Sequence, residues 1–160
     1  MLIRLSRESE YALEGLSVLA GQPAGTVMVL REIAELGQLP VGLLARTFQR
    51  LGRHGLVVSH RGGVRGYALA RAAREISVSE IFEAVEGPGI LARCLFSTGR
   101  CPRPVPCRLH PLWAALSPTL RQVMARTTLD DVVPRVVRGR RGRPRRSPRS
   151  GARSWEDKHA

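Results

Sequence analysis

Aromatic residues, cysteines and long apolar runs are all scarce in this chain of 160 residues. Only 4% of the residues are aromatic although 43% are hydrophobic, so a buried core must consist mainly of Leu, Val, Ile and Ala. Apolar runs never reach the roughly eighteen residues of a transmembrane helix, and no signal-peptide pattern follows the start. We therefore expect a folded, soluble, cytoplasmic protein that does not bind membranes.

Acidic residues are also few, because 13 Asp and Glu stand against 26 Lys and Arg, with a formal net charge of +13. Such a basic chain favours a polyanionic partner, most simply nucleic acid. Nine arginines and no acidic residue lie between positions 135 and 153. We expect residues 135–160 to form a disordered tail, which either touches phosphates without reading sequence or is merely solvated.

Catalytic motifs are missing as well. The sequence has no phosphate-binding glycine loop, no serine nucleophile motif and no paired carboxylates outside positions where helices begin. A thiol oxidoreductase would need a C-x-x-C motif, which is also absent. We infer that the protein is not an enzyme.

Two short helical patterns lie in the first half of the chain. Residues 30–36 predict one amphipathic helix, and Gly37 supplies the turn that follows. Pro40 suits the first position of a second helix, which extends to His54. Such a pair is typical of a helix-turn-helix, whose second helix enters the major groove of DNA. Its outward polar side chains are candidate base and phosphate contacts: Arg46, Thr47, Gln49, Arg50 and Arg53.

A basic hairpin is predicted directly after these helices. Residues 56–58 and 67–69 are typical of short strands, and the glycines between them allow a tight turn and a close backbone approach to a ligand. Arg61 and Arg65 would lie at the tip, where they can reach phosphates or a minor groove. A helix-turn-helix followed by such a hairpin is a winged helix, and we favour DNA binding over an ordinary small core.

Further helices are expected on both sides of this unit. Ser6 is a good N-cap for a first helix, and Ser77 opens a capping box that begins another. An apolar stripe over residues 109–123 predicts a long helix that has little of its own domain to pack on, so we expect a homodimer. Pro118 should kink or split this helix, and residues 128–131 predict a last short one.

All three cysteines lie between the winged unit and the long helix. Cys94, Cys101, Cys107 and His110 form a possible four-ligand set, and soft thiolates favour zinc or iron–sulfur clusters. The gaps of six and five residues are loose for a zinc knuckle and suit a larger inorganic core, so we favour an iron–sulfur cluster, with zinc as the alternative. Three thiols without any metal remain a further possibility.

The predicted fold is mainly α with a small β-hairpin wing. It comprises a winged helix-turn-helix DNA-binding domain over residues 1–87 and a cysteine-rich loop over 88–108. The dimerisation helix and a terminal short helix occupy 109–134, and the arginine-rich tail occupies 135–160.

Several short motifs together resemble a known family. They are Arg4-Leu-Ser6, Tyr11-Ala-Leu13, Leu30-Arg-Glu-Ile-Ala-Glu35, His54-Gly-Leu-Val57, Arg61-Gly62, Gly66-Tyr-Ala-Leu-Ala70 and Ile81-Phe-Glu-Ala-Val-Glu-Gly87. In this order and spacing they resemble the Rrf-type bacterial transcription regulators of the IscR, NsrR and RirA group. The resemblance covers residues 2–133. It implies a homodimeric winged-helix regulator of operator DNA, a repressor, controlled by an iron–sulfur cluster that senses iron, redox state or nitric oxide.

The resemblance also implies a ligand set. Cys94, Cys101 and Cys107 match the three family cysteines, and His110 matches the histidine that completes a two-iron cluster in the IscR branch. Glu10 aligns with the acidic position from which NsrR-like members lend a fourth ligand from the partner subunit. We favour a 2Fe-2S over a 4Fe-4S cluster, and the choice of fourth ligand stays open.

Overall fold

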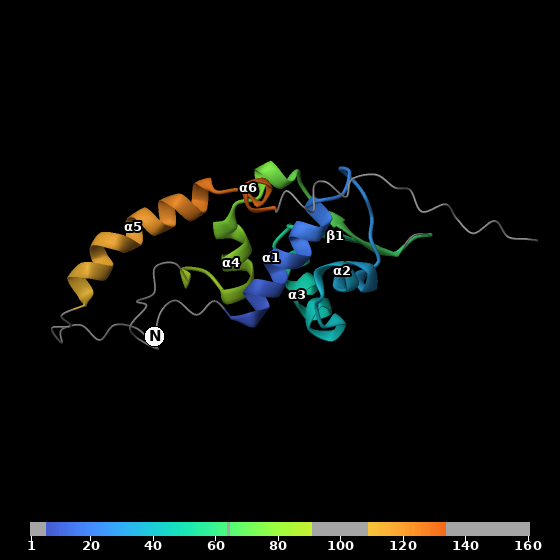
Figure 1. Cartoon of the computed structure of the whole chain (residues 1–160), viewed down its shortest axis with the longest axis horizontal. Coiled ribbons are helices and arrows are strands. Elements are labelled where there is room, and N and C mark those ends of the chain that lie inside the picture. The colour runs from blue at the N-terminus through green and yellow to red at the C-terminus, as the bar shows by residue number, and fades with distance from the viewer. Residues whose placement is uncertain (1–5, 64, 91–108, 134–160) are drawn as a thin grey trace, which may run out of the picture.

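The computed structural model describes residues 6–63, 65–90 and 109–133, so the three cysteines and the arginine-rich tail lie outside the described residues. Within these ranges the chain is mostly helical and carries one two-stranded antiparallel sheet, as the sequence predicts (Figure 1). The helices are α1 (Arg7–Ala20), α2 (Leu30–Gly37), α3 (Val41–Arg53), α4 (Val78–Glu86), α5 (His110–Arg126) and α6 (Leu129–Val132). The strands are β1 (Val57–His60) and β2 (Gly66–Leu69), and a 3-10 turn spans Ala73–Glu75.

Helix α1 lies at the centre and packs against α2, α3, α4 and α6 (Figure 1). The Ser6 hydroxyl caps it by accepting from the Ser9 N–H at 3.3 Å, which confirms the predicted start. Gly15 lets α3 approach closely, because a Cβ at this position would lie 2.7 Å from Cε2 of Phe48. The hydrophobic core therefore forms where α1 and α3 cross.

The turn between α2 and α3 differs from the expectation that Gly37 forms it. Gly37 is the last residue of α2, and the left-handed residue is Gln38, with φ of 54°. The backbone N–H of Leu39 then donates to the carbonyl of Ala34 at 2.8 Å, which satisfies the end of the helix. Leu39 also packs against Gly37, where a Cβ would lie 3.0 Å from its Cδ1. Glycine thus serves the close packing there.

The hairpin pairs β1 with β2, and Val57 lies opposite Leu69 while His60 lies opposite Gly66. Its β2 strand is also joined to the segment before α2. The Tyr67 N–H donates to the Met28 carbonyl at 2.8 Å, and the Met28 N–H donates to the Tyr67 carbonyl at 2.9 Å. A Cβ on Gly66 would collide with the Met28 carbonyl oxygen. The close backbone approach predicted for this glycine is therefore made to the chain itself.

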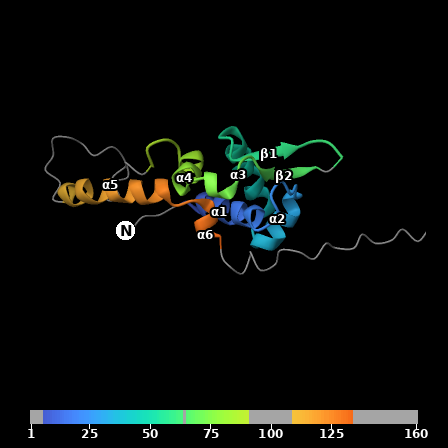
Figure 2. The same ribbon diagram turned by 90° about the horizontal axis from the view of Figure 1, so that it is seen from above.

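Helix α4 begins with the predicted capping box, in which Ser77 and Glu80 bond each other's backbone N–H groups. The end of α5 returns to this point. The Val78 N–H donates to the Thr127 carbonyl at 2.9 Å, and the Leu129 N–H donates to the Ile76 carbonyl at 2.8 Å. These bonds fix one end of α5, while its other end extends away from the remaining helices (Figures 1 and 2).

Helix α5 is unbroken, so Pro118 does not split it, which was one of the two outcomes expected for this proline. The fixed φ of proline fits a helix, and the chain continues without one N–H donor. Trp113 and Ser117 are buried, whereas Leu112, Leu116 and Val123 are 50%, 53% and 55% exposed. An apolar stripe of α5 thus stays uncovered in the single chain. In the part of the chain that the structure describes, no helix is long and apolar enough to cross a membrane.

Candidate nucleic-acid interface

An open groove lies between α3 and the hairpin, with a volume of about 700 Å³. Figure 2 shows the two strands projecting beside this helix. Both elements contribute basic or polar side chains to its lining: Gln49, Arg53, His60, Arg61 and Arg65. The structure thus brings four of the seven predicted DNA-contact residues into one groove.

The outer face of α3 carries Arg46, Gln49 and Arg53, which recur at i, i+3 and i+7 and are all exposed. This spacing places the three side chains on one stripe of the helix. The opposite face lies in the core and is fully buried: Leu44, Phe48 and Leu51. Burial of one face therefore fixes which side chains α3 presents outward.

Aromatic packing joins α3 to the hairpin. The rings of Phe48 and Tyr67 meet edge to face, with centroids 5.1 Å apart and planes at 82°. Phe48 is fully buried, and Tyr67 belongs to the strand that is also bonded to Met28. The hairpin and α3 are consequently held at a fixed relative position, as a surface that reads a rigid duplex requires.

Thr47 is placed differently from the sequence expectation. Its side chain is fully buried, and its hydroxyl donates to the Leu43 carbonyl at 3.0 Å. It lies three residues after Leu44 and four before Leu51, and therefore shares their inner face. The outward orientation expected for Thr47 is wrong.

Arg50 also differs from the other arginines of α3. One of its guanidinium nitrogens, Nη1, donates to the Val85 carbonyl at 2.7 Å and contacts Oε2 of Glu8 at 3.3 Å. Arg46, Arg53, Arg61 and Arg65 take part in neither of the ion pairs found among the described residues. Their charges therefore remain available for phosphates.

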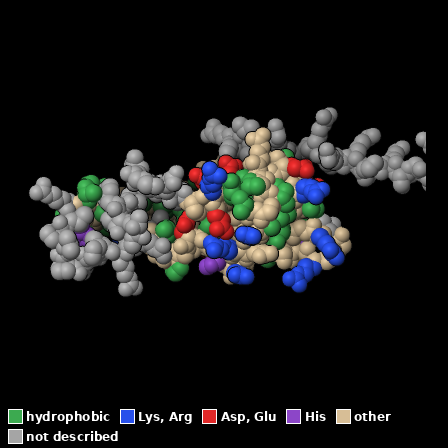
Figure 3. Space-filling view, turned by 90° about the horizontal axis from the view of Figure 1, so that it is seen from below, with side chains coloured by type: hydrophobic (Ala, Val, Ile, Leu, Met, Phe, Trp, Pro, Cys, Tyr) green, Lys and Arg blue, Asp and Glu red, His purple; other side chains and the backbone are tan. Residues whose placement is uncertain are grey.

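The side of the molecule on which α3 lies is seen from below in Figure 3. Separate arginine side chains are spread over this face, with acidic side chains between them and along its edge. Exposed arginines attract the phosphate backbone, and the attraction weakens as salt rises.

Comparison with known proteins agrees with this arrangement. The family described as "Rrf2: Iron-dependent Transcriptional regulator" matches residues 5–135. The chain belongs to the Rrf2 family. It is a transcription regulator and not an enzyme, as the sequence predicts.

Individual Rrf2 relatives cover most of the chain. A helix-turn-helix-type transcription regulator of Mycobacterium tuberculosis is 34% identical over 131 residues, which is 81% of each chain. The regulator IscR of Escherichia coli is 34% identical over 132 residues, covering 82% of this chain and 80% of IscR. The structure of CymR, the global cysteine regulator of Bacillus subtilis, matches with a TM-score of 0.69 at 25% identity, over 82% of this chain and 97% of CymR. The winged-helix fold is thereby confirmed.

The predicted metal site falls largely outside the described residues. Cys94, Cys101 and Cys107 are not among them, and the described residues alone hold no group of three metal-ligating side chains. His110 is the first residue of α5 and is exposed, and Glu10 is exposed on α1. Both candidate fourth ligands are thus free to face a site outside their own helix.

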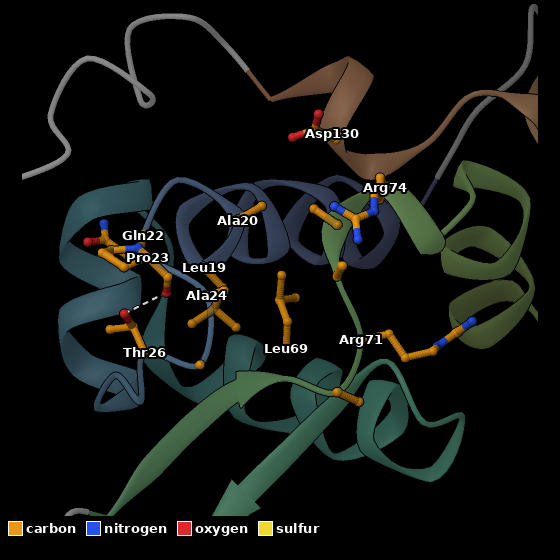
Figure 4. Close-up of a pocket in the computed structure, with 14 residues that line it drawn as sticks. Leu19, Ala20, Gln22, Pro23, Ala24, Thr26, Leu69, Arg71, Arg74 and Asp130 are labelled. Carbon is orange, nitrogen blue, oxygen red and sulfur yellow. Dashed lines mark hydrogen bonds between the residues drawn. The ribbon is translucent and has the colours of Figure 1, made fainter.

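A second hollow, of about 460 Å³, lies between the end of α1, the segment after β2, and α6 (Figure 4). Its floor includes Leu19 and Leu69, and Thr26 at one side donates its hydroxyl to the Pro23 carbonyl at 2.6 Å. Arg71 points away from the hollow in Figure 4 and pairs with Glu80 at 2.8 Å. Gln22, Arg74 and Asp130 add polar side chains to its lining.

Some contributors to the groove carry little sequence signal. Ser59 lines the groove from β1, but a serine in a four-residue strand does not stand out in the sequence. The pairing of Arg50 with Glu8 and Val85 joins residues 42 and 35 positions apart, so local patterns cannot reveal it.

Proposed function

We propose that this Rrf2 regulator binds operator DNA through the groove between α3 and the hairpin. The observation that carries the proposal is the convergence of Gln49, Arg53, Arg61 and Arg65 on one groove from two elements. Helix α3 would lie in the major groove, where Gln49 and Arg46 reach base edges. Arg61 and Arg65 would contact phosphates or the adjacent minor groove from the hairpin.

The proposed assembly is a homodimer in the cytoplasm, acting as a repressor at paired half-sites. Support comes from the exposed stripe of α5, because Leu112, Leu116 and Val123 are each at least half exposed in the single chain. A helix that leaves such a stripe uncovered gains free energy by burying it against a second copy.

The proposed sensor is an iron–sulfur cluster held by Cys94, Cys101 and Cys107. His110 or the partner subunit's Glu10 would be the fourth ligand, and the similarity to IscR supports a 2Fe-2S cluster. Such a cluster would supply a group whose oxidation or loss responds to iron, redox state or nitric oxide. The three thiolates would hold the iron. His110, the exposed first residue of α5, would move with the cysteine segment before it when the cluster changes or is lost.

A regulator that uses its thiols without a cluster is the second candidate. The similarity to the global cysteine regulator CymR favours it, since that protein shares the fold over 82% of this chain. Structural zinc in the same cysteine set is a further alternative. The three possibilities differ in what the purified protein contains.

Anaerobic purification followed by an absorption spectrum and assays of iron, sulfide and zinc separates these alternatives. We expect a coloured protein with iron and acid-labile sulfide in equal amounts, about two of each per chain. A colourless protein with one zinc per chain would support the structural-zinc alternative, and a metal-free protein that binds DNA normally would support the thiol alternative. Either result would refute the cluster.

The DNA-reading surface has its own test. A duplex enriched from a random-sequence library by the wild-type chain serves as the ligand, and the dissociation constant is measured over a range of salt concentrations. Arg53→Ala should weaken binding and lower the slope of log affinity against log salt by about two for the proposed dimer, because each protomer loses one phosphate contact. Removal of the tail from Arg138 onward should lower the slope but keep the preference for the enriched sequence. If the wild-type chain enriches no sequence, the proposal fails.

A further inference from the structure

Arg50 joins three helices through one nitrogen atom. Its Nη1 donates to the Val85 carbonyl at 2.7 Å and to Oε2 of Glu8 at 3.3 Å. Arg50 belongs to α3, whereas Val85 lies in the last turn of α4 and Glu8 in the first turn of α1. A single side chain of the DNA-reading helix thus reaches the ends of two other helices.

The charges explain why an arginine occupies this position. The last carbonyls of α4 have no partner within their own helix and carry the negative end of its dipole. The carboxylate of Glu8 adds a formal negative charge beside them. A guanidinium donates hydrogen bonds to the carbonyl and to the carboxylate and offsets their negative charge. Hydrogen bonds that involve a charged group are stronger than neutral ones. The Arg50 side chain is half exposed, so solvent screens part of this attraction.

The ends of α1 and α4 are also bonded to each other without Arg50. The carboxylate of Glu86 accepts from the Ser6 N–H at 3.0 Å and from the Ser9 hydroxyl at 2.5 Å. Ser9 is fully buried there. We call Ser6, Glu8, Ser9, Val85 and Glu86 the α1–α4 junction. Because this junction holds together on its own, it offers α3 a fixed support.

We propose that Arg50 is a positioning residue that holds the DNA-reading helix on the α1–α4 junction and does not contact phosphate. The inference rests on the proposed DNA-reading function of α3. It separates Arg50 from Arg46 and Arg53, which are exposed on the outer stripe of the same helix and pair with no carboxylate among the described residues. The beginning of α1, the end of α4 and α3 lie on the same side of the molecule (Figure 1).

Removing the partner carboxylate distinguishes the two roles of Arg50. If Arg50 contacted phosphate, Glu8→Gln would release its charge and strengthen binding to the enriched duplex. If Arg50 holds α3 on the junction, the same substitution loosens the helix and weakens binding. We expect Arg50→Ala to weaken binding about tenfold, the order of an ordinary coupling between sites. We expect Glu8→Gln to weaken binding as well, and to add little in the presence of Arg50→Ala.

The salt dependence gives a second, independent readout. Arg50→Ala should leave the slope of log affinity against log salt at the wild-type value, whereas the phosphate-contact control Arg53→Ala should lower it by about two, one for each protomer. Arg71 is the matched structural control, because it too bonds a carboxylate, Glu80 at 2.8 Å, and a backbone carbonyl, Glu75 at 3.2 Å. These contacts lie at the other end of α4, so Arg71→Ala should leave DNA affinity unchanged.

Thermal unfolding of each variant shows that a weakened binder is still folded at the assay temperature. The proposal is overturned if Glu8→Gln strengthens binding or leaves it unchanged, or if Arg50→Ala lowers the salt slope by about two, as Arg53→Ala is expected to do. Failure of the wild-type chain to enrich any duplex refutes the DNA-reading function itself. That outcome is distinct, since it concerns the unsubstituted protein.

Discussion

Replacing Gly66 by alanine should detach the hairpin from the segment before α2. The added Cβ would collide with the Met28 carbonyl oxygen, which is backbone and cannot rotate away, and would lie 3.1 Å from Cγ1 of Val27. Relief of the collision separates Tyr67 from Met28 and breaks the bonds of 2.8 and 2.9 Å between them. Each backbone hydrogen bond stabilises by about 1 kcal/mol net, so the free energy of unfolding should fall by about 2 kcal/mol.

The free energy of unfolding is measured by urea unfolding, monitored by circular dichroism. In a thermal melt, the expected loss of stability corresponds to a fall in melting temperature of about 5 to 10 °C. Gly62→Ala is the matched control, because no described atom lies within 4 Å of a Cβ at Gly62 in the same hairpin. It also corrects for the lower entropy that alanine gives the unfolded chain. The reasoning is refuted if Gly66→Ala is as stable as the wild type, or if both variants lose the same stability.

Three further predictions concern other parts of the chain. Leu116→Asp should give a folded monomer by light scattering, because Leu116 is 53% exposed in the single chain and lies on the proposed interface. The control Gln122→Asp, on another exposed side of α5, should stay dimeric. If the Leu116→Asp variant is also a dimer, the proposed interface is contradicted. Partial burial alone would raise the pKa of Glu86, but hydrogen bonds from Ser6 and Ser9 outweigh it and hold that pKa below its ordinary value. The stability that Glu86 contributes is therefore present above the ordinary carboxyl range and lost as pH falls through the lowered pKa. In urea unfolding at a series of pH values, Glu86→Gln should lower the free energy of unfolding at pH 7 and leave it unchanged at the acid end. A difference between wild type and variant that persists in acid would count against this. Thr47→Val should leave affinity for the enriched duplex unchanged in a titration, because the hydroxyl is buried against Leu43, and a loss of sequence preference without loss of folding would contradict this.

Local signals predicted most of the elements correctly. Ser6 and Ser77 mark helix starts because their hydroxyls satisfy backbone donors one turn later, a requirement that depends only on neighbouring residues. The glycine-rich basic stretch between two short apolar runs predicted the hairpin for the same reason. Elements whose ends are decided by such local chemistry can be read from the sequence alone.

Contacts between distant segments limited the rest. The glycines of the hairpin were expected to allow a close approach to a ligand, and the sequence does not show that Met28 is the neighbour of Gly66. Arg50 and Arg53 look alike as arginines near the end of one helix, and only their placement relative to Glu8 and Val85 separates them. The error at Thr47 has a different cause, because its position was not hidden by distant contacts. Its spacing from Leu44 and Leu51 was sufficient to assign it to the buried inner face of α3.

The attachment of α5 has a consequence for the DNA that this regulator recognises. Backbone bonds from Val78 to Thr127 and from Leu129 to Ile76 join the C-terminal end of α5 directly to the start of α4. In a dimer that pairs through α5, the distance between the two copies of α3 is consequently set by rigid helices. Such a dimer would fit only operators whose two half-sites are separated by one fixed distance. Inserting a few base pairs between the two half-sites of its operator should abolish cooperative binding, even though every base contact within each half-site is kept.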